Sequence, residues 1–85
     1  MIYQVIWSQK SIAVLDSLGN EARARIVKKV DGIREQPYLY VKRLVGVPLY
    51  RLRVGDYRVV MDIKNNELLI FVVELNCRGR VYDRL

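Results

Sequence analysis

The residues best suited to chemistry are three arginines placed around a short turn. Arg51 and Arg53 precede Gly55 and Asp56, and Arg58 follows them. Side chains two residues apart share a face of a strand, and a two-residue turn places Arg53 opposite Arg58. Like charges opposite each other destabilise a strand pair, so the pattern favours an anion-binding face over a face that only solvent covers. Guanidinium groups bind phosphate through paired hydrogen bonds, which points to a nucleic-acid backbone as the ligand.

The composition limits what other chemistry is available. Fifteen Lys and Arg residues against nine Asp and Glu give the 85-residue chain a net charge of +6, which favours an anionic partner. The chain has no His and one cysteine, Cys77, which excludes imidazole bases and an intramolecular disulfide. The acids nearest the arginines and the C-terminus form no compact ligand motif, so we expect neither a metal nor another cofactor.

No segment predicts an association with a membrane. The longest apolar run, Leu68 to Val73, is far too short to span a bilayer. The Met1 end has no basic segment leading into an apolar stretch, as a secretion signal would have. We therefore expect a cytoplasmic protein, and the length fits a single domain over residues 1–85.

The elements that position the arginines follow from hydrophobic spacing. Residues 2–7 predict a first strand, and Ser8 is placed to cap a helix containing Ile12, Leu15 and Leu18. Gly19 would end this helix and Asn20 would cap a second one, with a stripe of Ala22, Ile26, Val30 and Ile33 that ends before Pro37. After a connector over residues 36–48 come predicted strands at 49–54, 57–64 and 67–75, with a short last strand at Val81 and Tyr82. This order predicts an α+β domain with two helices on one face of a mostly antiparallel sheet.

Two-residue turns at Gly55-Asp56 and Asn65-Asn66 predict which side chains share a face. The helix-covered face would hold Tyr50, Leu52, Val54, Tyr57, Val59, Met61, Ile63, Leu68, Ile70 and Val72. The opposite face would carry the three arginines beside Val60, Phe71, Val73 and Leu75. An apolar patch rimmed by arginines predicts a docking site for an acidic, partly disordered partner. The alternative is that residues 78–85 fold back and cover the patch.

Three stretches of the sequence resemble the RelE/ParE superfamily of toxins from toxin–antitoxin pairs. The segment LYRLRVGDYRV at residues 49–59 is similar to the central motif of the superfamily. Lys42-Arg43-Leu44 before a Gly, and Arg78-Gly79-Arg80-Val81-Tyr82 at the end, also match its pattern. The resemblance covers nearly the whole chain.

The resemblance implies a ribosome-dependent mRNA endonuclease that needs no metal and is held inactive by an acidic, RelB-like antitoxin in a hetero-oligomer. Arg51, Arg53, Arg58, Arg78 and Tyr82 fall on the basic and tyrosine positions of the catalytic cluster. Lys42, Arg43 and Arg80 would be further RNA contacts.

The chain departs from this pattern at two places. Arg53 stands where relatives commonly carry lysine, and arginine is a poor general base because its pKa exceeds about 12. Cys77 stands where many relatives have His before the terminal arginine. Two alternatives therefore stay open: a ParE-like toxin that acts on DNA gyrase without nuclease activity, and a basic nucleic-acid-binding module without catalysis.

Overall fold

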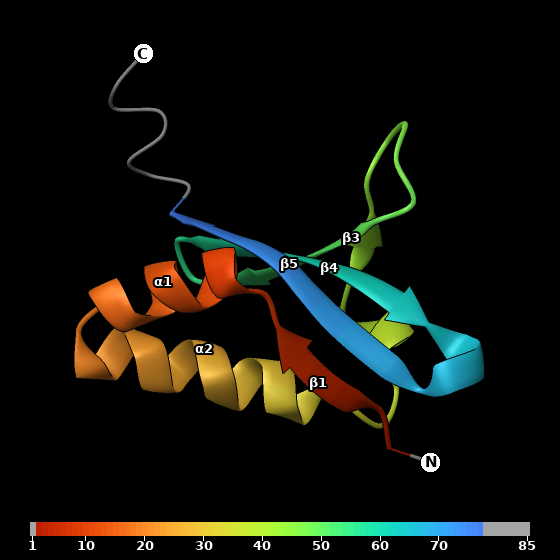
Figure 1. The fold of residues 1–85 in the computed structure, drawn as a ribbon, viewed down its shortest axis with the longest axis horizontal. Helices are drawn as coiled ribbons and strands as arrows, with labels where there is room; N and C mark the ends of the chain where they lie inside the picture. The colour runs from red at the N-terminus through yellow and green to blue at the C-terminus, as the bar shows by residue number, and fades with distance from the viewer. Residues whose placement is uncertain (1, 78–85) are drawn as a thin grey trace.

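The computed structural model describes residues 2–77, which form a five-stranded sheet and two α-helices (Figure 1). In chain order the elements are β1 (Gln4–Trp7), α1 (Gln9–Ser17), α2 (Asn20–Gly32), the 3₁₀ turn η1 (Pro37–Leu39), β2 (Lys42–Arg43), β3 (Tyr50–Val54), β4 (Tyr57–Lys64), the 3₁₀ turn η2 (Asn65–Glu67) and β5 (Leu69–Cys77). The strand order is β1-β5-β4-β3-β2, with β1 parallel to β5 and all other neighbours antiparallel. The predicted α+β fold with a mostly antiparallel sheet is confirmed.

The structure contains one strand that the sequence pattern does not predict. This two-residue strand, β2, lies within the segment expected to be a connector, and it pairs with β3 at the edge of the sheet. The last strand predicted at Val81 and Tyr82 lies outside the described residues. Within residues 2–77, neither helix is long and apolar enough to cross a membrane.

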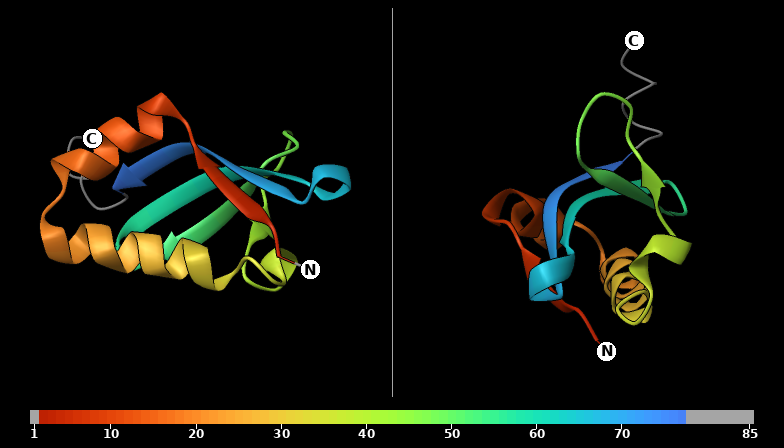
Figure 2. Two further views of the ribbon diagram at one scale, coloured as in Figure 1. Left: turned by 60° about the horizontal axis from the view of Figure 1, so that its bottom comes forward. Right: turned by 90° about the vertical axis from the view of Figure 1, so that its right-hand side faces the viewer.

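Both helices lie on one side of the sheet, and we call the opposite side the outer face (Figure 2). Helix α1 contacts β5 and α2 contacts β3. The predicted stripe on α2 is confirmed, because Ile26, Val30 and Ile33 are almost fully buried. They form one core with Leu15 of α1 and with the inward side chains of β3, β4 and β5, among them Leu52, Val59, Met61, Ile70 and Val72.

The helix ends differ in detail from the prediction. Ser8 caps α1 as expected, since its side-chain oxygen accepts a hydrogen bond from the Ser11 N–H at 3.1 Å. Ser11, rather than Ile12, faces the sheet. Its fully buried hydroxyl lies 3.5 Å from the Val72 carbonyl of β5 and donates to the Ser8 carbonyl at 2.8 Å, whereas Ile12 stays 42% exposed. Gly19 has an extended backbone and is itself the N-cap of α2, so Asn20 is the first helical residue and not the cap.

The first hairpin has the predicted turn and the second does not. Val54 opposes Tyr57 across Gly55-Asp56, and Gly55 has a φ of +60°, as a glycine-first turn requires. The expected two-residue turn at Asn65-Asn66 is wrong: η2 is followed by Leu68 in a left-handed conformation, and Lys64 opposes Leu69. Because the loop is longer by two residues, Ile70 and Val72 still face the core as predicted.

A β-bulge on β5 changes which residues face the core near the end of the sheet. Met61 opposes Val72 but Val60 opposes Glu74, so Val73 is an extra residue on β5. Beyond this point the alternation is reversed, and Leu75 opposes Val59 inside the core with an exposure of 1%. The prediction that Leu75 lies on the outer face is therefore wrong.

Candidate nucleic-acid interface

Four cations lie together on the outer face, over β2, β3 and β4. Arg53 opposes Arg58 as predicted, and Lys42 of β2 opposes Arg51 of β3. Directly opposed residues of neighbouring strands point to the same side, so all four share one face. We call Lys42, Arg51, Arg53 and Arg58 the cation cluster. A hollow of about 270 Å³ is lined by Tyr40, Lys42, Arg51 and Arg53.

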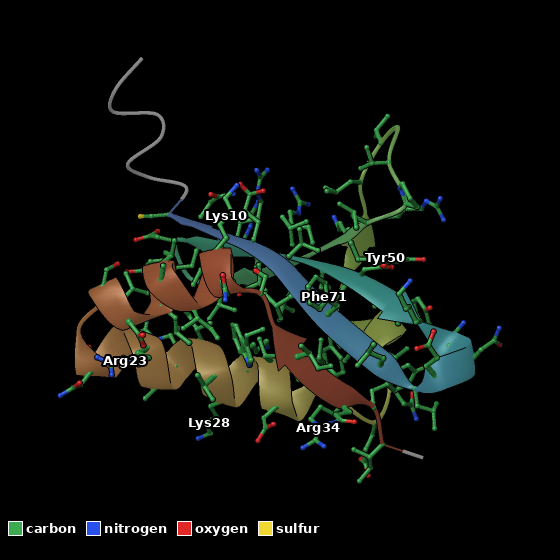
Figure 3. The ribbon with its side chains drawn as sticks, viewed as in Figure 1. Lys10, Arg23, Lys28, Arg34, Tyr50 and Phe71 are labelled. Carbon is green, nitrogen blue, oxygen red and sulfur yellow. The ribbon has the colours of Figure 1, made fainter. Side chains whose placement is uncertain are left out.

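The acids of the outer face are occupied by other cations. Glu74 pairs with Lys10 at the start of α1, which projects beside β5 in Figure 3, with an N–O distance of 3.4 Å. Asp62 pairs with Lys64 at 3.3 Å. Within residues 2–77, no ion pair or side-chain hydrogen bond involves the cation cluster. The positive charge of this face is therefore not neutralised by the acids beside it, and an external anion can bind there.

Arg43 does not join the cation cluster. It opposes Tyr50, whose neighbours Leu52 and Val54 face the helices, and its guanidinium carbon lies 6.0 Å from the centre of the Tyr50 ring. Since successive residues of a strand point to opposite sides, Lys42 and Arg43 cannot both reach the outer face. The two residues predicted as neighbouring RNA contacts are thus divided between the two sides of the sheet.

The remaining predicted RNA and catalytic residues, Arg78, Arg80 and Tyr82, lie outside the described residues. The described chain ends at Cys77 of β5, a half-buried free thiol opposite Tyr57. Its neighbour Asn76 opposes Arg58. Among residues 2–77, no three His, Cys, Asp or Glu side chains gather as metal ligands.

The apolar side of the outer face differs from the predicted patch. Val60 is only 4% exposed, and the long side chains of Arg51 and Glu74 flank it in the neighbouring strands. With Leu75 in the core, two of the four predicted contacts are therefore not accessible. Phe71 and Val73 are half-buried.

The sequence pattern missed one residue of this apolar area, Ile6. It opposes Phe71 on the edge strand β1 and is 41% exposed (Phe71 is labelled in Figure 3). The pattern gives no signal for it, because the parallel pairing of β1 with β5 places together two strands that lie far apart in the chain.

Two tyrosines near β2 have different roles. The Tyr38 hydroxyl donates to Asn65 Oδ1 at 2.8 Å and its ring packs edge-on against Tyr50, so this side chain holds η1 against the sheet. Desolvation, together with the nearby Tyr50 and Tyr3, raises the pKa of Tyr38 above its ordinary value. Tyr40 is instead 51% exposed and lines the hollow beside the cation cluster, a position that sequence spacing did not indicate.

Comparison with known proteins gives the same relatives by sequence and by fold. The profile of the ParE toxin of type II toxin–antitoxin systems matches residues 5–82. The mRNA interferase toxin RelE of Escherichia coli is 25% identical over 83 residues, covering 94% of this chain and 87% of that protein. Two toxin–antitoxin complexes contain chains of the same fold. In the archaeal RelE–RelB complex of Pyrococcus horikoshii the match has a TM-score of 0.80, 30% identity, and coverage of 94% of this chain and 99% of the other. In the RelBE2 complex of Mycobacterium tuberculosis the TM-score is 0.85 at 18% identity, with coverage of 92% and 100%.

The family profile thus spans most of the chain, and the archaeal RelE chain shares both the sequence pattern and the fold. This chain therefore belongs to the ParE toxin family of type II toxin–antitoxin systems, within the RelE/ParE superfamily.

Proposed function

We propose that this toxin is a ribosome-dependent mRNA endonuclease that inhibits translation in the cytoplasm. The observation that carries the proposal is the cation cluster, whose charge is not neutralised by any acid within residues 2–77. Guanidinium groups gathered on one face suit the phosphates of an RNA substrate. The likeness to the E. coli mRNA interferase toxin RelE supports the same activity.

The chemistry proposed is attack of a ribose 2′-oxygen on the adjacent phosphorus. As the new O–P bond forms, the 2′-hydroxyl releases its proton to solvent and the bond to the leaving 5′-oxygen breaks. That oxygen takes up a proton, which yields a cyclic phosphate and a 5′-hydroxyl. Arg51, Arg53 and Arg58 would stabilise the charge that develops on the phosphate oxygens. Arg78 would donate to the leaving oxygen or add a further charge, and Tyr82 would stack on a base or orient the 2′-hydroxyl.

This proposal assigns electrostatic roles to the arginines and no general base. Arginine stays protonated at neutral pH, so it cannot remove the 2′-hydroxyl proton as a neutral lysine could. Stabilisation of the transition state does not depend on proton removal by the same group. No metal is required, because guanidinium groups take the place of a metal ion beside the phosphate.

We also propose an acidic, RelB-like antitoxin as the partner. The archaeal and E. coli relatives are seen in complexes with RelB, and the outer face offers complementary features. Ile6, Phe71 and Val73 supply apolar contacts beside the cation cluster, and the net charge of +6 favours an acidic partner. A bound antitoxin would thereby cover the surface that RNA needs.

A second candidate function is ParE-like inhibition of DNA gyrase without RNA cleavage. It is favoured by the family profile, which describes ParE toxins, and by arginine where related nucleases commonly carry lysine. The fold is shared by both kinds of toxin and does not decide between them.

One experiment separates the two functions. Purified toxin is added to a reconstituted translation system, in which mRNA 3′ ends are mapped, and to a gyrase supercoiling assay. We expect new 3′ ends only when ribosomes translate, and their loss in Arg58→Gln. Lys64→Gln is the control, because it removes an equal charge from the same strand while leaving the cation cluster intact. Inhibition of supercoiling without RNA cleavage would favour the ParE-like function.

A further inference from the structure

A second basic hollow lies between helix α2 and the edge of β3. Its volume is about 470 Å³, and its polar lining consists of Arg25, Lys28, Lys29, Tyr40 and Arg53. The floor includes Ile33 and Val54, which are themselves almost fully buried. We call this hollow the α2 groove. Among the described residues that line it, none is acidic.

The fold explains why this groove is open and basic. Lys28 and Lys29 follow Arg25 by three and four residues, on a side of α2 next to the buried stripe (Lys28 is labelled in Figure 3). The short strand β2 pairs with only two residues of β3, so residues 52–54 have no strand neighbour on this side within the described chain.

At one end, the Arg25 guanidinium reaches from α2 to the β3–β4 turn. A Cβ built on Gly55 would lie 3.3 Å from Arg25 Nη1. Arg25 thus lies at the open edge of the sheet.

The α2 groove is continuous with the cation cluster. Tyr40 and Arg53 line both this groove and the smaller hollow over Lys42 and Arg51. Tyr40 is 51% exposed, and the Lys29 ammonium lies 5.8 Å from the centre of its ring. One basic surface therefore runs from the outer face, around the sheet edge at Tyr40, onto α2.

We propose that the α2 groove binds the backbone of the single-stranded RNA that lies on the cation cluster, with a base stacked on Tyr40. This inference rests on the proposed function, and it extends the RNA site beyond the residues placed at the reacting phosphate. Cations that follow a backbone, with an exposed aromatic ring between them, are the features by which proteins bind single strands. A protein partner fits less well, because the apolar floor is already buried and offers little surface for apolar side chains.

Binding of a labelled single-stranded oligoribonucleotide to the purified full chain tests the proposal. The α2 variant, Lys28→Gln/Lys29→Gln, is compared with Arg23→Gln/Lys64→Gln. This control removes the same charge outside the groove, at the start of α2 and at the end of β4, and leaves Lys10 paired with Glu74. For single strands, the logarithm of the affinity falls with the logarithm of the salt concentration, and each phosphate contact adds about 0.7 to the steepness of this fall. Two lost contacts therefore lower the affinity about 25-fold at about 0.1 M salt. We expect this loss, and a slope smaller by about 1.4, only in the α2 variant. Tyr40→Leu weakens binding about ten-fold, within the range for loss of one stacked base, while Tyr40→Phe does not.

The outcomes are distinct. Equal affinity of the α2 variant and the control, with wild-type toxin that binds RNA and cleaves mRNA, overturns the α2 groove and leaves the proposed function intact. Wild-type toxin that neither binds the oligoribonucleotide nor cleaves mRNA overturns both. A variant that keeps RNA affinity but loses affinity for a poly-glutamate peptide also overturns the proposal, and assigns the groove to an acidic protein. The exposed positions of Lys28 and Lys29 predict unchanged folding, which thermal melting by circular dichroism verifies.

Discussion

Replacing Arg58 should make the folded toxin more stable and less active at the same time. Arg58 is half-buried and directly opposes the exposed Arg53 across the β3–β4 hairpin. No ion pair within residues 2–77 relieves either charge. Opposed like charges in an antiparallel pair cost up to about 1 kcal/mol, and the long guanidinium stems allow the two groups to splay apart, so we take about 0.5 kcal/mol. Arg58→Gln should therefore raise the melting temperature by about 2–4 °C.

Activity should change in the opposite direction. Removing one donor that stabilises charge in a transition state costs about 10²–10³-fold in rate. We expect a loss of this size in ribosome-dependent cleavage by Arg58→Gln. A gain of stability combined with a loss of activity would show that the cluster is retained for a ligand and not for the fold.

The pair can be tested by a double-mutant cycle in thermal or denaturant unfolding. Arg53→Gln should stabilise about as much as Arg58→Gln, and the double variant should gain little more, because either change alone removes the repulsion. The gain should nearly vanish at about 1 M salt, where the screening length falls to about 3 Å. If both single variants are instead less stable than wild type, the two arginines contribute to folding and the argument from repulsion is wrong.

Four further outcomes are expected. Leu75→Ala should lower the free energy of unfolding by about 2–4 kcal/mol, because Leu75 is buried in the core. Phe71→Ala should lower it clearly less and should weaken antitoxin binding, because Phe71 is only half-buried. Equal losses in denaturant unfolding would contradict the faces assigned to the two residues. Gly55→Ala should lower the free energy of unfolding by about 1 kcal/mol, because an alanine is strained at a φ of +60°. An unchanged free energy in denaturant unfolding would show that the turn changes type. Because the pKa of Tyr38 is raised in the folded state, its neutral hydroxyl contributes to the free energy of unfolding fully below about pH 10, and this contribution is lost as pH rises through the raised value. Tyr38→Phe should remove this part of the pH dependence of unfolding at alkaline pH. Elemental analysis of the purified toxin should find no stoichiometric transition metal, and finding one would contradict the metal-independent chemistry.

The β3–β4 hairpin could be predicted in detail because its signals are local. Glycine first in a two-residue turn sets the register, and alternation then places Arg51, Arg53 and Arg58 on one face. The β4–β5 connection could not be predicted in this way, because Asn65 accepts hydrogen bonds from the hydroxyls of two distant tyrosines, at 2.7 and 2.8 Å. Tertiary contacts of this kind override the preference of an Asn-Asn pair for a tight turn.

The bulge explains the main error about the candidate site. Val72 and Val73 are both β-branched apolar residues, so the local pattern does not show which of them is the extra one. One extra residue reverses every later side chain, and for that reason Leu75 moved from the expected outer face into the core. The α2 groove needs the packing of α2 beside β3, which no spacing along the chain encodes.

Under the proposed function, the arrangement of the outer face makes antitoxin and RNA compete. The apolar area around Ile6 and Phe71 lies over β1 and β5, and the cation cluster lies over β2, β3 and β4 of the same sheet. The row from Arg51 through Val60 to Glu74 crosses between them, and its acid, Glu74, is already paired with Lys10. A chain that docks on the apolar area therefore meets cations as soon as it extends across β4. Carboxylates on that chain would gain the charge-assisted contacts that phosphates make, so one bound segment would both hold the toxin and occupy its RNA site.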